Sequence, residues 1–344
     1  MTTAPGDGPR RAAATPGAPT AQVPGAAGSG PGPMSMAGKD RMGRLFAATA
    51  TGSGVLILMT LAAVAVFLVL RAWPALTADP GELAGIAWYP EDGSFLSFVG
   101  PLVFGTLLAA LLALLLAVPV AMGIALFISH YAPRRLAASL GYVVDLLAAI
   151  PSVVYGLWGA TWLAPRLGPA WEWLSANAGG VPLFAGPAAT PPRVMMTVGV
   201  VLAVMILPII TAVSREVFLQ TPRLHEEAAL ALGATRWEMI RMAVLPFGRS
   251  GVISASMLGL GRALGETMAV LMILSPGFTY SVALLQAGRH QTIAANIANQ
   301  FPEANPLGVS AWIATGLVLF VITLAVHMTA RWVGSRRKDF SGAN

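Results

Sequence analysis

Long runs of apolar residues recur along this 344-residue chain. Six of these runs reach the roughly 20 residues that a helix needs to cross about 30 Å of hydrocarbon. They cover residues 46–70, 98–129, 140–165, 194–214, 251–275 and 308–332. A membrane β-barrel would show alternating positions instead, and in lipid only helices and closed barrels satisfy their own backbone hydrogen bonds. The pattern therefore predicts an all-α integral membrane protein with six transmembrane helices.

The segments outside these runs define the domain organisation. Residues 1–38 are rich in Gly, Pro, Ala, Ser and Thr and hold almost no large apolar side chain. Such a segment buries too little apolar surface to offset the conformational entropy lost on folding, so we expect a disordered tail. Residues 39–338 then form one transmembrane domain, in which residues 215–250 are the loop between the fourth and fifth spans. Residues 339–344 form a short second tail.

Basic residues are distributed unequally about the six spans. Sixteen of the 21 Lys and Arg lie before the first span, after the second, after the fourth, or from Arg331 at the end of the sixth onward. Lys and Arg are enriched in the cytoplasmic loops of membrane proteins. We therefore expect a multi-pass protein of the cell membrane with both termini in the cytoplasm, and with residues 71–97, 166–193 and 276–307 outside. With only 10% charged residues, the composition excludes an ordinary soluble enzyme.

The chain offers few groups for catalysis or for holding a cofactor. It has no cysteine, and its four histidines are scattered, so no metal site is predicted. The pattern G-x-x-x-x-G-K-[ST] of a triphosphate-binding loop is missing from the sequence. The glycines of GLGRALG lack dinucleotide-binding spacing, and we expect Gly261 and Gly265 to serve close helix packing. The chain is thus predicted to be no enzyme and to bind no cofactor itself.

The loop between the fourth and fifth spans reads RLHEEAALALGATRWEMIRMAVLPFGRSG. Strong helix formers fill residues 224–232, and Gly233 ends that run as a glycine in left-handed conformation would. A second short helix can begin at Thr235 and end at Pro246. The sequence therefore predicts a helix, a glycine turn and a second helix on the cytoplasmic side of the membrane.

This loop resembles the EAA loop of ABC (ATP-binding cassette) importer permeases at six positions: Glu227, Ala228, Ala229, Gly233, Leu245 and Pro246. One position departs from the family pattern, because Ala243 stands where an isoleucine is usual. The resemblance implies a type I ABC importer permease fold, in which this coupling helix docks in a cleft of a separate ATPase and Glu227 caps or orients it. ATP and Mg would then be bound by that partner.

Two charged residues, Arg262 and Glu266, fall inside the fifth predicted span. An arginine at the bilayer centre costs about 2.5 to 3.5 kcal/mol on insertion scales, so its presence calls for a reason. Four residues apart, the two side chains are expected on one helix face, where they can form a structural ion pair. Alternatively, the guanidinium can bind an oxyanion during transport. We expect Pro151 to break the third span, and Ser152 and Tyr155 beside it are further candidates for hydrogen bonds into a transport path.

The strings MLGLGRALGETMAV and LLAAIPSVVYGLWG resemble the phosphate-specific ABC transporter permeases of the PstC type, over residues 98–332. That resemblance implies that Arg262 and Glu266 act in the import of inorganic phosphate. It also implies three partners: a homologous second permease (PstA type), an ATPase dimer (PstB type) and an extracytoplasmic phosphate-binding protein (PstS type). The alternatives are a permease for sulfate or molybdate, or a secondary phosphate transporter, which should show an internal repeat with broken helices.

Overall fold

The computed structural model describes residues 36–83, 86, 89 and 94–335. These residues are helical nearly throughout, and within them extended pairing is limited to an isolated bridge between Pro276 and His290. The chain divides into two compact units at Leu61 and Ala62, and most of the structure belongs to the second unit. The two predicted tails lie outside the described residues, apart from residues 36–38, which begin the first helix.

Among the described residues, five helical segments are long and apolar enough to cross a membrane, and a bent pair of helices makes up to six. This number agrees with the six predicted spans. The five are α1 (Met36–Thr77), α3 (Phe95–Leu126) continued by the π-helical η1 (Phe127–Tyr131), α7 (Met195–Leu219), the segment Arg236–Leu264, and α13 (Pro306–Ser335). The bent pair corresponds to the third predicted span.

The third span is broken at Pro151, as the sequence predicts. It consists of α4 (Arg134–Ala148), α5 (Ser152–Trp158), the π-helical η2 (Gly159–Leu163) and α6 (Ala164–Ala178). The part that follows Pro151 is bent by 91° from α4. Proline lacks a backbone N–H and disfavours helical conformation in the residue before it, so α4 ends ahead of Pro151. The break leaves backbone carbonyls without their helical partners.

The fifth span differs from the prediction. The helix begins in the preceding loop, because α9 (Arg236–Met239), the π-helical η4 (Ile240–Val244) and α10 (Leu245–Leu264) form one segment. The second short helix therefore does not end at Pro246, since the π-helical turn before it accommodates the missing N–H. At its other end, α10 stops at Leu264, and the chain continues after a break as α11 (Met268–Ile273).

The core of the second unit lies where α3 and α10 pack on α7. Small side chains let membrane helices approach closely. On α3 they recur every four residues and are fully buried: Ala109, Ala113, Ala117 and Ala121. Large residues of α7 fill the facing positions, among them Leu202, Met205 and Ile206. This packing fixes the position of α10, which carries the candidate site.

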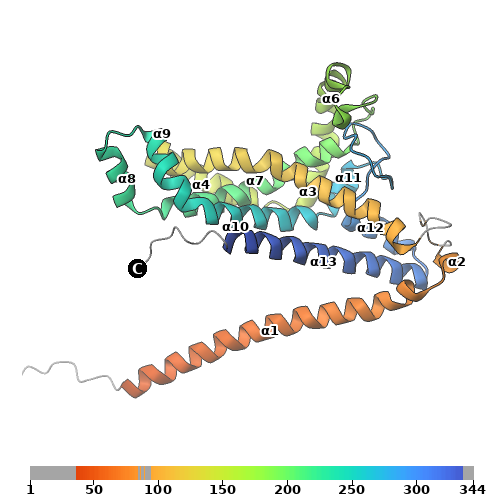
Figure 1. Cartoon of the computed structure of the whole chain (residues 1–344), viewed down its shortest axis with the longest axis horizontal. Helices are drawn as coiled ribbons and strands as arrows, with labels where there is room; N and C mark the ends of the chain where they lie inside the picture. Colours follow the sequence, from red (N-terminus) through yellow and green to blue (C-terminus); the bar gives the residue numbers. More distant parts are fainter. Residues whose placement is uncertain (1–35, 84–85, 87–88, 90–93, 336–344) are drawn as a thin grey trace, which may run out of the picture. The chain divides into compact units, whose positions relative to one another are not determined.

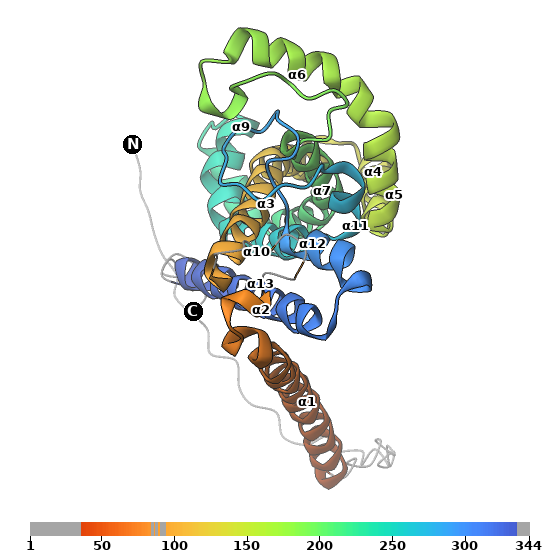
Figure 2. The same cartoon turned by 90° about the vertical axis from the view of Figure 1, so that its right-hand side faces the viewer.

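The helices of this core run lengthwise through the second unit, so that its two ends carry different elements (Figure 1). One end holds the hairpin of α8 (Arg223–Ala231) and α9. The opposite end holds α6, α11 and α12 (Ile293–Gln300), onto which Figure 2 looks. Short elements complete the chain: α2 (Pro80–Leu83), η3 (Pro182–Phe184) and η5 (Phe301–Glu303).

Candidate functional site

Arg262 lies in the last turn of α10 and reaches the break between α4 and α5. Its Nη1 donates to the carbonyl of Ala148 and its Nη2 to the carbonyl of Ile150, both at 3.4 Å. These are carbonyls at the point where Pro151 interrupts the helix. A guanidinium carries five N–H donors, so this half-buried side chain keeps further donors for another acceptor.

Tyr155 and Ser152 lie at the same break. The Tyr155 ring is buried, and its hydroxyl donates to the carbonyl of Leu147 at 2.9 Å, so it joins α5 to the end of α4. Ser152 begins α5 and is half-buried. Together, Tyr155 and Arg262 provide donors for three carbonyls at the interruption, which satisfies groups that would be costly to leave unpaired in a membrane.

Glu266 lies in the break between α10 and α11 and is only 6% exposed. Its Oε1 accepts a hydrogen bond from the backbone N–H of Ala269 at 2.9 Å, in the first turn of α11. Glu266 thus caps this short helix, as a carboxylate does at a helix N-terminus.

The predicted ion pair of Arg262 and Glu266 does not form. Ion pairs within the described ranges join His130 to Glu226 and Arg215 to Asp145. The prediction assumed one continuous helix, but α10 ends at Leu264, so Glu266 no longer follows Arg262 along a helical face.

Two glycines fix how the helices around Arg262 pack. A Cβ atom on Gly156 of α5 would lie 2.8 Å from the Cα of Ala269, so only glycine lets α5 approach α11 this closely. A Cβ atom on Gly261 would lie 3.2 Å from the His327 ring of α13, which confirms close packing at that position. Gly265 is different: it is exposed, and no other helix lies within 4 Å of the position of its Cβ. The expectation of close helix packing at Gly265 is therefore not met by another helix in the described part of this chain.

The hairpin of α8 and α9 has the predicted form. Gly233 has φ +86° and ends the first helix in left-handed conformation, as predicted. Ala229 packs against buried residues of the core, whereas Glu227 and Ala228 are exposed. The cap of α8 is Pro222, without a side-chain hydrogen bond. Glu227 lies inside the helix and does not cap α8, while its expected role in orienting the docked helix stays a prediction.

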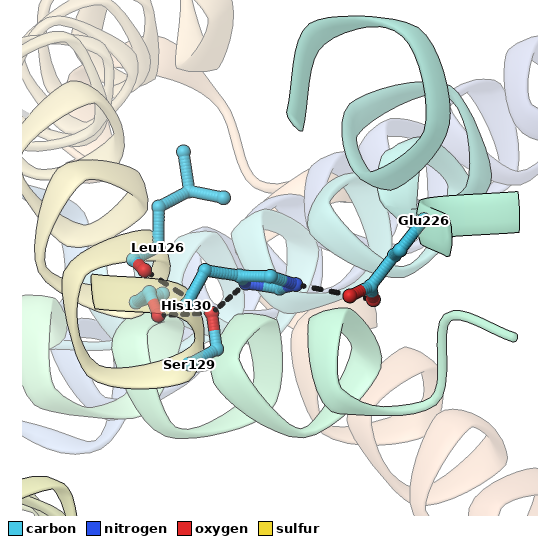
Figure 3. Close-up of polar contacts among 5 residues, drawn as sticks. Leu126, Ser129, His130 and Glu226 are labelled. Carbon is cyan, nitrogen blue, oxygen red and sulfur yellow. Dashed lines mark hydrogen bonds and ion pairs between the residues drawn. The ribbon is translucent and has the colours of Figure 1, made fainter. Parts of the chain in front are cut away.

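Two polar features of the hairpin were missed from the sequence. The first is a capping box, in which Thr235 Oγ1 accepts from the N–H of Glu238 and Glu238 Oε2 accepts from the N–H of Thr235. Its signature T-R-W-E was readable in the sequence. The second joins Glu226 of α8 to His130 at the end of η1, with 3.4 Å between Oε1 and Nε2 (Figure 3). No local signal predicts a contact between residues 96 positions apart.

The opposite end of the second unit carries a cavity and a buried histidine. The cavity, of about 320 Å³, lies beside α11, and Arg193 at its edge donates from Nη2 to the carbonyl of Met272 at 3.3 Å. His290 is buried, with Nε2 2.6 Å from the carbonyl of Ser281. Burial lowers the pKa of His290, and the Ser281 carbonyl only partly offsets this effect.

The fold and the site define the class of the protein, a multi-pass membrane permease. Residues 117–339 match the family described as the binding-protein-dependent transport system inner membrane component. In the same fold class is a bacterial ABC transporter involved in the import of the acidic polysaccharide alginate. One of its chains aligns with a TM-score of 0.50 and 20% identity, over 86% of this chain and 100% of that one.

Closer relatives in sequence are phosphate transport system permease proteins. PstC 2 of Mycobacterium tuberculosis is 48% identical over 293 residues, which cover 84% of this chain and 90% of the relative. PstC of Haemophilus influenzae is 36% identical over 304 residues, 87% of this chain and 95% of the relative. The chain therefore belongs to the PstC family of ABC importer permeases, and as a transporter subunit it is not itself an enzyme.

Proposed function

We propose that this chain is one of two membrane subunits of an ATP-driven importer that carries inorganic phosphate into the cell. The observation that carries this proposal is the 36% to 48% identity to PstC permeases over most of the chain. The alternatives are import of sulfate or molybdate. A secondary phosphate transporter has less support, because it leaves the coupling hairpin without a role.

Arg262 supplies fixed positive charge for the phosphate ion in this proposal. A guanidinium matches an oxyanion with two parallel hydrogen bonds, and desolvation inside the membrane strengthens the attraction. Glu266 lies four positions along the chain and caps α11. We propose that it keeps α11 in place beside Arg262 while the ion passes. Ser152 stays a proposed path residue, while Tyr155 acts by holding α5 to α4.

A homologous second permease, of the PstA type, completes the path. Gly265 and Met268 are exposed beside Arg262 and Glu266, and so are the α5 residues Val153, Val154 and Leu157. The candidate site is therefore open on the surface of this chain. A second permease that covers this surface would enclose the phosphate ion between two subunits.

The two ends of the helical core suit different partners. We propose that the exposed Glu227 and Ala228 of α8 dock on an ATPase dimer of the PstB type, which would bind ATP and Mg. The opposite end, with α6 and α12, would receive the phosphate-binding protein of the PstS type (Figure 1). The distribution of Lys and Arg supports this orientation, with both termini cytoplasmic.

Uptake of radiolabelled phosphate tests the proposal in cells that lack this permease. The wild-type chain is expected to restore uptake that excess sulfate or molybdate does not inhibit. Arg262→Gln is expected to assemble with the ATPase but to abolish uptake, whereas Arg71→Gln, at an exposed external arginine, is the matched control with normal uptake. Competition by sulfate contradicts the assignment of phosphate, and normal uptake by Arg262→Gln contradicts the assignment of the site.

A further inference from the structure

The coupling helix α8 is weakly attached to the rest of the second unit. None of its residues is buried, and its apolar contact is made by Ala229, which is only partly buried against the core. Its two ends continue into α7 through Thr221 and into α9 through the Gly233 turn. A helix held in this way can swing when a partner moves it, unless a further contact ties it to a membrane span.

Glu226 makes such a contact with the end of the second span. The side chain of His130, 8% exposed, points from η1 towards α8, and Glu226 Oε1 lies 3.4 Å from its Nε2 (Figure 3). A carboxylate only accepts, so Nε2 carries the proton of this bond. The other ring nitrogen, Nδ1, lies 2.7 Å from Ser129 Oγ, which fixes the orientation of the ring. Because the histidine is shielded from solvent, the contact is worth more than an exposed surface pair.

The span that carries His130 extends without a break to the opposite end of the unit. From η1, α3 runs back to Phe95, and it packs along α7 through its buried alanines. Near its other end, Thr106 Oγ1 accepts the N–H of Ile293, which begins α12, at 3.0 Å. Gly105 touches the carbonyl of Gln291 so closely that no side chain fits there. A displacement of α3 therefore reaches the external segment around residues 290–293.

We propose that His130 and Glu226 are positioning residues that transmit movement between α8 and α3. The inference rests on the proposed function, because it assumes that an ATPase moves α8. In this arrangement, the ATPase pulls α8, the His130–Glu226 bond pulls α3, and α3 displaces the start of α12 at the external end. The same bond reports, in the reverse direction, that a binding protein has docked.

The experiment uses the complete transporter in proteoliposomes, with both permeases, the ATPase and phosphate-loaded binding protein. ATP hydrolysis and radiolabelled phosphate uptake are measured together in the same vesicles. His130→Ala and Glu226→Ala are expected to assemble and to hydrolyse ATP, but to lower the phosphate imported per ATP by about threefold to tenfold. The double variant is expected to be no worse than either single variant, since both remove one bond.

Two further variants separate this role from general damage to the fold. Glu226→Gln keeps an oxygen acceptor at the same distance, so it is expected to retain most of the coupling. Ser139→Ala, at an exposed serine of α4 outside the coupling helix and the His130 contact, is expected to leave the phosphate-to-ATP ratio unchanged. If His130→Ala fails to assemble, the comparison of Glu226→Ala with Glu226→Gln tests the inference instead. A purely structural role of Glu226 would lower the protein yield but would not change the phosphate imported per ATP.

The inference is overturned if the single variants keep the wild-type ratio, or if their losses multiply in the double variant. It is likewise overturned if Glu226→Gln and Glu226→Ala lower the phosphate imported per ATP by the same factor. The wild-type transporter in the same vesicles tests the proposed function separately, because only a phosphate importer responds to phosphate-loaded binding protein. Failure of the coupling pair and failure of the phosphate assignment are thus distinguishable.

Discussion

At the scale of single residues, Arg262 has a structural role, to which the proposed function adds a role in transport. Its guanidinium donates to two carbonyls at the α4–α5 break, which makes the charge part of the fold. In the proposed function the same side chain attracts phosphate with the donors that remain. The structural bonds would hold the guanidinium at a defined position, and that preorganisation reduces the entropy lost when an anion binds.

Arg262→Lys tests how far the bonds to the α4–α5 break and the proposed binding of phosphate depend on the forked shape of the guanidinium. Lysine keeps the positive charge, but its single ammonium does not reproduce two parallel bonds to Ala148 and Ile150. We expect a loss of about 1–2 kcal/mol of unfolding free energy, from two long hydrogen bonds in a half-buried site. Thermal unfolding of the purified protein measures this loss. A variant with unchanged stability and normal uptake would show that charge alone is required.

His290 makes stability depend on pH. Burial lowers its pKa in the folded protein below the ordinary value of 6.5. As pH falls through about 6.5, His290 takes up a proton in the unfolded chain but stays neutral in the folded protein. The free energy of unfolding therefore declines. We expect the unfolding temperature of the purified protein to fall between about pH 7 and pH 5, and to fall less in His290→Gln. The exposed His225→Gln is the control, and an identical slope in all three proteins would contradict the prediction.

At the scale of elements, two broken helices carry the candidate site, and the sequence predicted the break at Pro151 but not the one after Leu264. The apolar pattern located the spans, because membrane burial follows hydrophobicity along the chain. Pro151 predicted the break in the third span, but not its angle of 91°, and nothing in the pattern predicted that α10 ends at Leu264. The hydropathy pattern alone does not locate such breaks, because the residues on both sides of each break are apolar.

Long-range contacts were also beyond the sequence. Arg262 and Glu266 were identified as a charged pair from their positions in a span, yet their hydrogen-bond partners are carbonyl and N–H groups of other residues. Backbone groups have no signature in a sequence, and neither does the pairing of His130 with Glu226. The turn at Gly233, in contrast, was predictable because a local rule governs it.

The contact of α5 with α11 joins the α4–α5 break to the α10–α11 break. A substitution at Gly156 tests how important this contact is. In Gly156→Ala, a methyl group would press on the Ala269 backbone at 2.8 Å, and overpacking of this kind costs about 1–3 kcal/mol. We expect lower thermal stability and lower phosphate uptake, because α11 moves away from Arg262. Gly123→Ala is the matched control in α3, where nothing lies within 4 Å of the added carbon. Equal stability of the two variants would show that the contact tolerates a side chain.

At the scale of the whole molecule, the proposed transport cycle requires that the coupling hairpin and the α12 end face opposite sides of the membrane. The two features lie at opposite ends of the second unit (Figure 1). A helical core of this kind fixes the positions of its two ends relative to each other, because α3, α7 and α10 pack along their length. The direction in which this unit is inserted stays a prediction from the basic residues, which are concentrated around the hairpin and the termini.

Single cysteines test this orientation directly, since the natural chain contains none. Leu232, 90% exposed beside the Gly233 turn, and Glu303, exposed in η5, are suitable positions at the two ends. We expect a membrane-impermeant maleimide to label Glu303→Cys in intact cells and Leu232→Cys only after the membrane is opened. The reverse pattern would place the hairpin outside, where no ATPase is available. The assignment of α8 as a coupling helix would then be wrong, whatever the transported ion.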